Sequence, residues 1–199
     1  MSRKIVIFLL VLGLAILGGA AGLRAATGTP DTTADTIGGA FSLTDQNGKT
    51  VTDSDFRGRL MLVEFGYTAC PNICPQQLEL IRVALDSLGD KAKKIAPIFV
   101  TLDPDHDTPG HLHDYLAVFS NHEPAFTGLT GPMKNIDDMA RRYHIYYQKN
   151  FAPGTGDVLS VDHSIALFLM DKNGDFIRTF TGPSPGELTA GLNDALNHM

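Results

Sequence analysis

Two cysteines stand at the junction between a buried strand and an amphipathic helix, and this junction constrains the fold more than any other feature of the chain. Cys70 and Cys74 are the only cysteines among the 199 residues, and the segment around them reads FGYTACPNICP. Before it, residues 60–65 (LMLVEF) form a short apolar run typical of a buried strand. After it, apolar residues recur at intervals of three and four, which predicts a helix with one buried face: Leu78, Ile81, Leu85 and Leu88.

The order of the predicted elements indicates an α/β fold of the thioredoxin-like class. A hairpin is predicted first, because residues 41–52 alternate in polarity around Asn47-Gly48, a dipeptide that favours tight turns. Strands and helices then alternate, which indicates a mixed sheet flanked by helices, and the cysteine pair follows the first core strand. The predicted strands are residues 60–65, 95–102, 165–170 and 176–180, and further helices are predicted at 111–119, 136–143 and 185–197.

The spacing of the cysteines favours chemistry over a passive surface disulfide, because a structural disulfide stabilises more when it closes a longer loop. Thioredoxin-type enzymes use Cys-x-x-Cys, whereas three residues lie between Cys70 and Cys74, so both sulfurs have more freedom to face one ion. Two thiolates are too few for a structural zinc site, which takes four ligands. The remaining interpretations are a redox pair and two ligands for a soft metal such as copper(I), completed by an imidazole.

Pro75 predicts where the helix begins, because proline is favoured at the first helical position. Cys74 would then lie at or near the N-cap, where free N–H groups and the helix dipole stabilise negative charge. We therefore expect a lowered pKa for Cys74. A thiolate is both the nucleophile and the metal ligand, so this position suits either interpretation.

His163 is the candidate third ligand. It stands directly before the predicted strand at 165–170, and in a thioredoxin-like fold the loop at this point lies beside the helix that carries the cysteines. From the residues alone, a surface or core role for His163 competes evenly with a ligand role. Asp103 ends the predicted strand 95–102, where it could orient His163 or offer a weak oxygen ligand, and capping of the following turn is the competing interpretation.

A looser group of histidines follows Asp103 in the segment DHDTPGHLH. His106, His111 and His113 could bind metal weakly, but we expect a solvated loop and helix start here. Positions 111 and 113 point to different sides of a helix, so they do not form a natural pair.

The N-terminus is predicted to be a targeting or anchoring segment rather than part of the folded domain. Residues 5–23 carry no charge and follow Arg3 and Lys4. This length favours an uncleaved membrane anchor over a signal peptide, which has a shorter apolar stretch and a small-residue cleavage site. The positive-inside rule then puts the domain on the extracytoplasmic (periplasmic) side of the membrane. If the N-terminus is cleaved instead, we expect the protein to be secreted or periplasmic. We divide the chain into an anchor or signal (1–24), a flexible tether (25–39) and a thioredoxin-like domain (40–199).

The charge of the chain argues against a nucleic-acid partner. Arg3, Lys4 and Arg24 are three of its 16 basic residues, and none of its 22 acidic residues lies before residue 25, so the remainder has a net charge of -9. Nucleic-acid binding needs clustered Lys and Arg.

Three segments in order, GYTACPNICP, FVTLDPDHDTP and VDHSIALFLMDKNGDF, together resemble the Sco/SenC proteins over about residues 38–197. Those proteins are copper-binding assembly factors for cytochrome c oxidase, anchored by one N-terminal helix. The resemblance implies that Cys70, Cys74 and His163 bind copper, as Cu(I) or Cu(II), and it puts the family's Asp-Pro aspartate on Asp103 with a less settled role. The implied partners are the copper A centre of cytochrome c oxidase subunit II, an upstream copper donor or thiol reductant, and the membrane.

Two functions are compatible with these residues. Both use Cys70 and Cys74, and they differ in the role of His163. A metallochaperone would hold copper with two thiolates and one imidazole and pass it on without turnover. A thiol–disulfide reductase would use Cys70 and Cys74 to keep the oxidase's copper-site cysteines reduced, with His163 as a bystander or a base. A peroxidase related to the peroxiredoxins is a weaker third interpretation, because Thr68 precedes Cys70 by two residues rather than three and no nearby Arg is evident.

Overall fold

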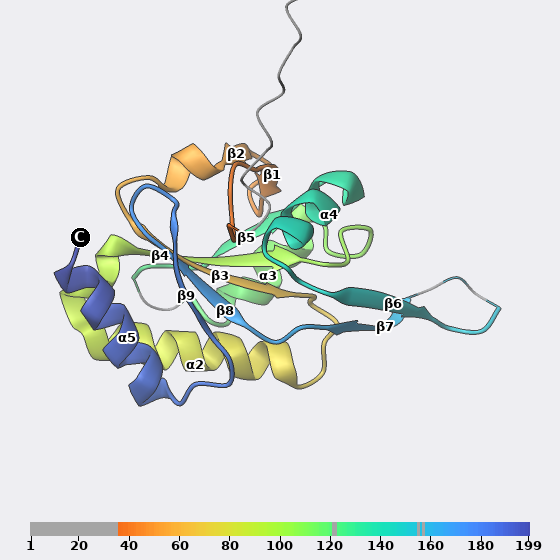
Figure 1. Cartoon of the computed structure of the whole chain (residues 1–199). Coiled ribbons are helices and arrows are strands. Elements are labelled where there is room, and N and C mark those ends of the chain that lie inside the picture. The colour runs from red at the N-terminus through yellow and green to blue at the C-terminus, as the bar shows by residue number, and fades with distance from the viewer. Residues whose placement is uncertain (1–35, 121–122, 155, 157) are drawn as a thin grey trace, which may run out of the picture. The chain divides into compact units, whose positions relative to one another are not determined.

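The structure is a computed structural model that describes residues 36–120, 123–154, 156 and 158–199. Its larger sheet contains β1 (Ser42–Asp45), β2 (Thr50–Thr52), β3 (Leu60–Gly66), β4 (Ile95–Thr101), β5 (Thr127–Thr130), β8 (Leu167–Met170) and β9 (Phe176–Phe180). The strand order is β2-β1-β5-β4-β3-β8-β9 (Figure 1). The three central strands β3, β4 and β5 are parallel, and their neighbours pair antiparallel. This mixed sheet confirms the predicted α/β, thioredoxin-like class.

The helices cover the sheet and enclose its core. They are α2 (Ile73–Leu88), α3 (Pro109–Ala117), α4 (Met133–Arg142) and α5 (Pro185–Asn197), with short 3₁₀ helices η1 (Asp53–Phe56) and η2 (Gly89–Lys94). Helices α2 and α5 pack together along one face of the sheet, and α4 lies on the opposite side (Figure 1). Every residue of β3 and β4 is buried, as the continuous apolar runs predict.

The predicted N-terminal hairpin is present as β1 and β2. Gly48 adopts a positive φ of 79°, which the tight turn requires. The Asp45 carboxylate accepts hydrogen bonds from the backbone N–H groups of Asn47 and Lys49 at 2.9 and 2.8 Å, so the turn is held by a side chain as well as by the strand ladder.

A second, two-stranded sheet was not predicted from the sequence. It consists of β6 (Tyr147–Phe151) and β7 (Val158–His163), which pair antiparallel and extend away from the larger sheet (Figure 1). The prediction that His163 lies in a loop is therefore wrong, because it is the last residue of β7 and pairs with Tyr147. Strand β5, four residues long and including Gly128, was missed as well.

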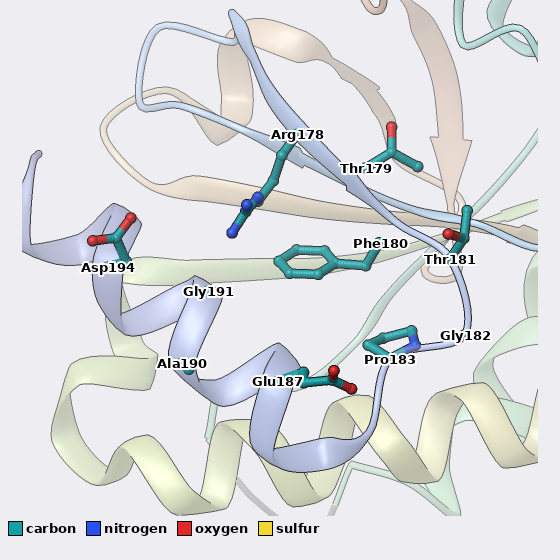
Figure 2. Close-up of a pocket in the computed structure, with 10 residues that line it drawn as sticks. All are labelled: Arg178, Thr179, Phe180, Thr181, Gly182, Pro183, Glu187, Ala190, Gly191 and Asp194. Carbon is teal, nitrogen blue, oxygen red and sulfur yellow. The ribbon is translucent and has the colours of Figure 1, made fainter.

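Helix α5 packs closely on β9 because Gly191 has no side chain. A Cβ at Gly191 would lie 2.6 Å from the ring of Phe180. The guanidinium of Arg178 lies over the same ring at 5.4 Å from its centroid. The hollow beside this contact is lined by β9, α5 and the segment that joins them, and its lining contains neither cysteine nor histidine (Figure 2), so it is a feature of packing rather than of the cysteine chemistry.

The predicted anchor or signal (1–24) and most of the predicted tether lie outside the described residues. Within the described part of the chain, no helix has the length and apolar character needed to cross a membrane.

Candidate functional site

The two cysteines lie where β3 gives way to α2. Asn72 is the N-cap and Ile73 the first residue of the helix, so Cys74 occupies the second helical position and Pro75 the third. The expectation of Pro75 at the first helical position is therefore wrong by two residues, and Cys74, expected at or near the N-cap, lies two residues after it. The helix begins earlier because the N–H of Cys70 closes a turn onto the carbonyl of Tyr67 at 3.2 Å, which brings the chain round before Pro75 is reached.

The helix N-terminus acts on Cys70 rather than on Cys74. The backbone N–H of Cys74 donates to the Cys70 sulfur at 3.4 Å. Burial alone would raise the pKa of the Cys70 thiol, but the N–H of Cys74, its thiol and the N–H groups of the two preceding residues together hold that pKa below its ordinary value. Both cysteines are free thiols, and Cys70 is 8% exposed.

Cys74 has the opposite character. It is completely buried, and this burial, together with the Cys70 sulfur and the charge of Glu64, raises the pKa of its thiol far above the ordinary value, although a backbone hydrogen bond with Tyr67 opposes the shift. The predicted lowered pKa thus belongs to Cys70. The pair is asymmetric, with one sulfur poised to ionise and one that stays protonated until an ion or an electrophile arrives.

Gly66, the last residue of β3, lets the Cys74 sulfur rest against the backbone of the strand. A Cβ at this position would lie 2.8 Å from the Cys74 Sγ and 2.9 Å from the ring of Phe99. Contacts below 3.0 Å are essentially never made by a real Cβ, so only glycine permits this position of the sulfur. Nothing in the local sequence pattern singled out Gly66.

His163 lies beside Cys74, although 89 residues separate them in the chain. Its Nε2 is 3.9 Å from the Cys74 Sγ, and its Nδ1 is 3.0 Å from the carbonyl oxygen of Ser164. A proton on Nδ1 can be donated to that carbonyl, which leaves the lone pair of Nε2 directed at the sulfur. The ring of Tyr67 meets the imidazole edge to face at 6.3 Å, which limits its rotation.

Cys70 and His163 line one cleft. One wall is formed by Tyr67 and residues 70–73, which lead into α2, and the other by the end of β7 and Ile165. Ile73 and Ile165 are 39% and 46% exposed. The cleft therefore presents the Cys70 sulfur and the His163 imidazole within an apolar rim that another protein could reach, and the Cys74 sulfur is buried beside them.

Asp103 follows β4 and is bonded to the β6–β7 sheet. Its Oδ1 accepts from the Nζ of Lys149 on β6 at 2.7 Å, and both side chains are largely buried, with 4% and 13% exposed. Lys149 pairs with Val161 of β7, two residues before His163. Asp103 is thus bonded to the hairpin that ends at His163, and the prediction that it orients His163 stays a prediction.

A second aspartate, missed from the sequence, holds the loop before Cys70. Asp107 is completely buried and accepts hydrogen bonds from the backbone N–H of Thr68 at 3.0 Å, from the Thr68 hydroxyl at 2.5 Å and from the hydroxyl of Thr101 at 2.5 Å. The Thr68 hydroxyl is therefore committed to Asp107, which gives no support to a peroxidase-like role beside Cys70. A third aspartate within five residues, in Asp103-Pro104-Asp105-His106-Asp107, was the available signal.

Glu64, in the middle of β3, is a buried acid behind the cysteines. It is 3% exposed, and its Oε2 has no hydrogen-bond partner within the described part of the chain. Burial, and then the charge of Cys70, raise the pKa of this carboxyl well above its ordinary value. A charged residue type inside the apolar run LMLVEF was the signal that could have revealed it.

Comparisons with known proteins agree on one family. The SCO1/SenC family model matches residues 29–196. "Protein sco1" of Schizosaccharomyces pombe is 41% identical over 154 residues, which are 76% of this chain and 57% of that protein. Human "Protein SCO1 homolog, mitochondrial" is 34% identical over 159 residues, 78% of this chain and 52% of that protein. The chain thus spans about half the length of these curated relatives.

Solved structures give the same picture. The structure of Bradyrhizobium japonicum ScoI with copper bound is 39% identical, covers 80% of this chain and 99% of its own, and has a TM-score of 0.71. Yeast Sco1 with copper bound is 32% identical, covers 82% of this chain and 88% of its own, and has a TM-score of 0.70.

Proposed function

The chain belongs to the SCO1/SenC family, and from that premise we propose that it is a copper metallochaperone for the copper A centre of cytochrome c oxidase. In this proposal Cys70, Cys74 and His163 bind the copper. The single observation that carries the proposal is the 3.9 Å approach of the His163 Nε2 to the Cys74 Sγ, beside a second sulfur.

The chemistry of these donors fits copper. Thiolates are soft ligands that select Cu(I), and an imidazole suits copper in either oxidation state. In metal-binding histidines, the ring nitrogen that does not bind the metal usually donates a hydrogen bond to a neighbouring group. The Nδ1 of His163 can donate to the carbonyl of Ser164 in this way, which leaves its Nε2 free to bind copper. The structures of relatives from Bradyrhizobium japonicum, Arabidopsis thaliana and yeast contain bound copper.

Metal binding would also change the protonation of the pair. Because the pKa of Cys74 is raised by burial, that thiol is protonated at neutral pH and must release its proton to become a ligand. Copper uptake is therefore expected to become tighter as pH rises. The shallow cleft with Ile73 and Ile165 at its rim suits a transfer in which a partner's cysteines replace these ligands one at a time.

The thiol–disulfide reductase remains a second candidate, favoured by the asymmetry of the two thiols. The thiolate of Cys70 would attack a partner disulfide, form a mixed disulfide and release one partner thiolate. Cys74, after losing its proton, would then displace the second partner thiolate and form the Cys70–Cys74 disulfide, so the partner gains two electrons and the chain loses two.

We also propose the cellular arrangement that the sequence suggests. Residues 1–24 would hold the protein at the membrane, residues 25–39 would act as a tether, and the copper-binding domain would face the extracytoplasmic side. The oxidase would be met there through its subunit II.

The His163→Ala variant separates the two candidates. The reduced full chain, purified in mild detergent, is titrated with Cu(I) against a colorimetric chelator, and its reaction with a small aromatic disulfide is timed in parallel. We expect His163→Ala to lose tight copper binding while thiol exchange continues. His113→Ala, at an exposed position, is the matched control. Unchanged copper affinity in His163→Ala would refute the ligand set, and normal oxidase assembly in cells carrying that variant would refute the chaperone role.

A further inference from the structure

Two histidines outside the cysteine cleft lie side by side next to a buried carboxylate. The rings of His106 and His111 meet edge to face, with their centroids 4.7 Å apart. One nitrogen from each ring and one oxygen of Asp107 all lie within 4.8 Å of one another. His113 points elsewhere and contacts Asp114 at 3.2 Å, so the group that the sequence suggested separates into a pair and a bystander.

The backbone beneath this pair is tightly hydrogen-bonded. The N–H groups of His106 and Asp107 both donate to the carbonyl of Asp103, at 3.1 and 2.9 Å. The N–H of Thr108 returns to the carbonyl of His106 at 3.0 Å, and the Thr108 hydroxyl caps α3 by accepting from the N–H of His111 at 3.3 Å. The two histidines are therefore presented by a fixed turn and the first turn of a helix.

Each imidazole has a nitrogen available. The Nδ1 of His111 is 3.3 Å from the carbonyl oxygen of His106, a contact that leaves its Nε2 free, as in most metal-binding histidines. Both side chains are exposed and can rotate. The Asp107 carboxylate is held in place by two threonines: its Oδ2 accepts two hydrogen bonds and its Oδ1 one, so Oδ1 keeps a lone pair to offer.

The distances lie close to those of a metal site. Two ligands on one ion, each at about 2.1 Å, can be no more than about 4.2 Å apart. The observed limit of 4.8 Å exceeds this by little more than half an ångström, which a small rotation of an exposed imidazole removes. Asp105 beside His106 adds a negative charge that is 87% exposed, although the Nζ of Lys149, 3.7 Å from its carboxylate, offsets part of it.

We propose that His106, His111 and Asp107 form a second metal site that takes a borderline divalent cation, with Cu2+ bound most tightly. Imidazole nitrogen suits this class of ion, and affinity at such sites rises to a maximum at Cu2+ in the first-row series. The site uses none of the residues of the cysteine cleft, so it stands whether or not the proposed copper ligands are correct.

The experiment removes the cleft ligands first. The full chain carrying Cys70→Ser, Cys74→Ser and His163→Ala is titrated with Cu2+ in detergent, followed by electron paramagnetic resonance. We expect one Cu2+ per chain, with splitting from two nitrogens. Adding His106→Ala or His111→Ala should weaken binding more than about 10-fold and remove one nitrogen from the spectrum.

The control is His113→Ala in the same background, which should leave affinity and spectrum unchanged. His106→Gln and His111→Gln keep a polar side chain of similar size and repeat the test if an alanine variant unfolds. Unchanged Cu2+ affinity in the His106 and His111 variants, or an equal loss in His113→Ala, would overturn the second site. Neither result bears on the proposed Cys70, Cys74 and His163 ligands, which are absent throughout.

Discussion

The Nε2 of His163 lies 3.9 Å from the Sγ of Cys74, and the two residues are brought together by structures that share no secondary-structure element. Cys74 is fixed by the first turn of α2, and His163 by the β6–β7 pairing that Asp103 ties to the end of β4. Three features of the site can be tested one at a time: the packing of the Cys74 sulfur, the ion pair between Asp103 and Lys149, and the ionisation of the groups around the two thiols.

Gly66→Ala tests the packing of the sulfur. The new Cβ would lie 2.8 Å from the Cys74 Sγ, so either the sulfur or β3 must shift. We expect the free energy of unfolding to fall by about 1–3 kcal/mol, as overpacking of a core usually costs, and copper binding to weaken. Gly186→Ala is the control, because nothing lies within 4 Å of its Cβ. Chemical denaturation and copper titration of both variants measure the effect, and equal stability of the two would contradict the packing argument.

Lys149→Ala tests the tie that holds the hairpin. It leaves the buried carboxylate of Asp103 without its 2.7 Å partner. Removal of one member of a buried ion pair costs about 3–5 kcal/mol, so a large loss of stability is expected, with copper affinity lowered as the hairpin loosens. Lys93→Ala breaks an exposed pair with Asp90 and should leave the thermal midpoint unchanged. If the Asp103–Lys149 ion pair did not stabilise the hairpin, the two variants would have similar thermal midpoints.

Glu64→Gln tests the buried acid through the pH dependence of stability. The pKa of Glu64 is raised in the folded protein, so above the ordinary pKa the unfolded chain is ionised while the folded chain keeps its proton. Between the two pKa values this group lowers the free energy of unfolding by about 1.4 kcal/mol for each pH unit gained. We therefore expect the wild type to lose stability relative to Glu64→Gln as pH rises from about 5 to 7. The free energy of unfolding of both proteins is measured by urea denaturation at each pH. If the two free energies changed in parallel with pH, the raised pKa of Glu64 in the folded protein would be contradicted.

Differential alkylation tests the asymmetry of the thiols. The pKa of Cys70 is lowered by the N–H groups at the start of α2, whereas burial raises that of Cys74. Iodoacetamide at neutral pH should therefore modify Cys70 first and leave Cys74 largely unmodified, as mass spectrometry of the digested protein will report. The rate at Cys70 should rise with pH around a midpoint below that of a free thiol. Preferential labelling of Cys74 would reverse the assignment of nucleophile and resolving thiol.

The elements that were predicted correctly are those with strong local patterns. Strands β3 and β4 are continuous apolar runs, and α2 shows apolar residues at helical spacing. Strand β5 and the β6–β7 pair were missed because their residues become strands only through partners elsewhere in the chain. Thr127–Thr130 is short and contains a glycine, and β6 is mostly polar and half exposed, so neither carries a clear period.

The sequence by itself determined that two cysteines stand between a buried strand and a helix, because apolar periodicity and the positions of cysteine and proline are local properties. The tertiary structure alone decided which sulfur ionises. The helix begins at Ile73, so its free N–H groups point at Cys70, while the packing of β3 removes Cys74 from water. Hydrogen bonding stabilises a thiolate and burial opposes it, and both depend on neighbours that the order of residues does not reveal.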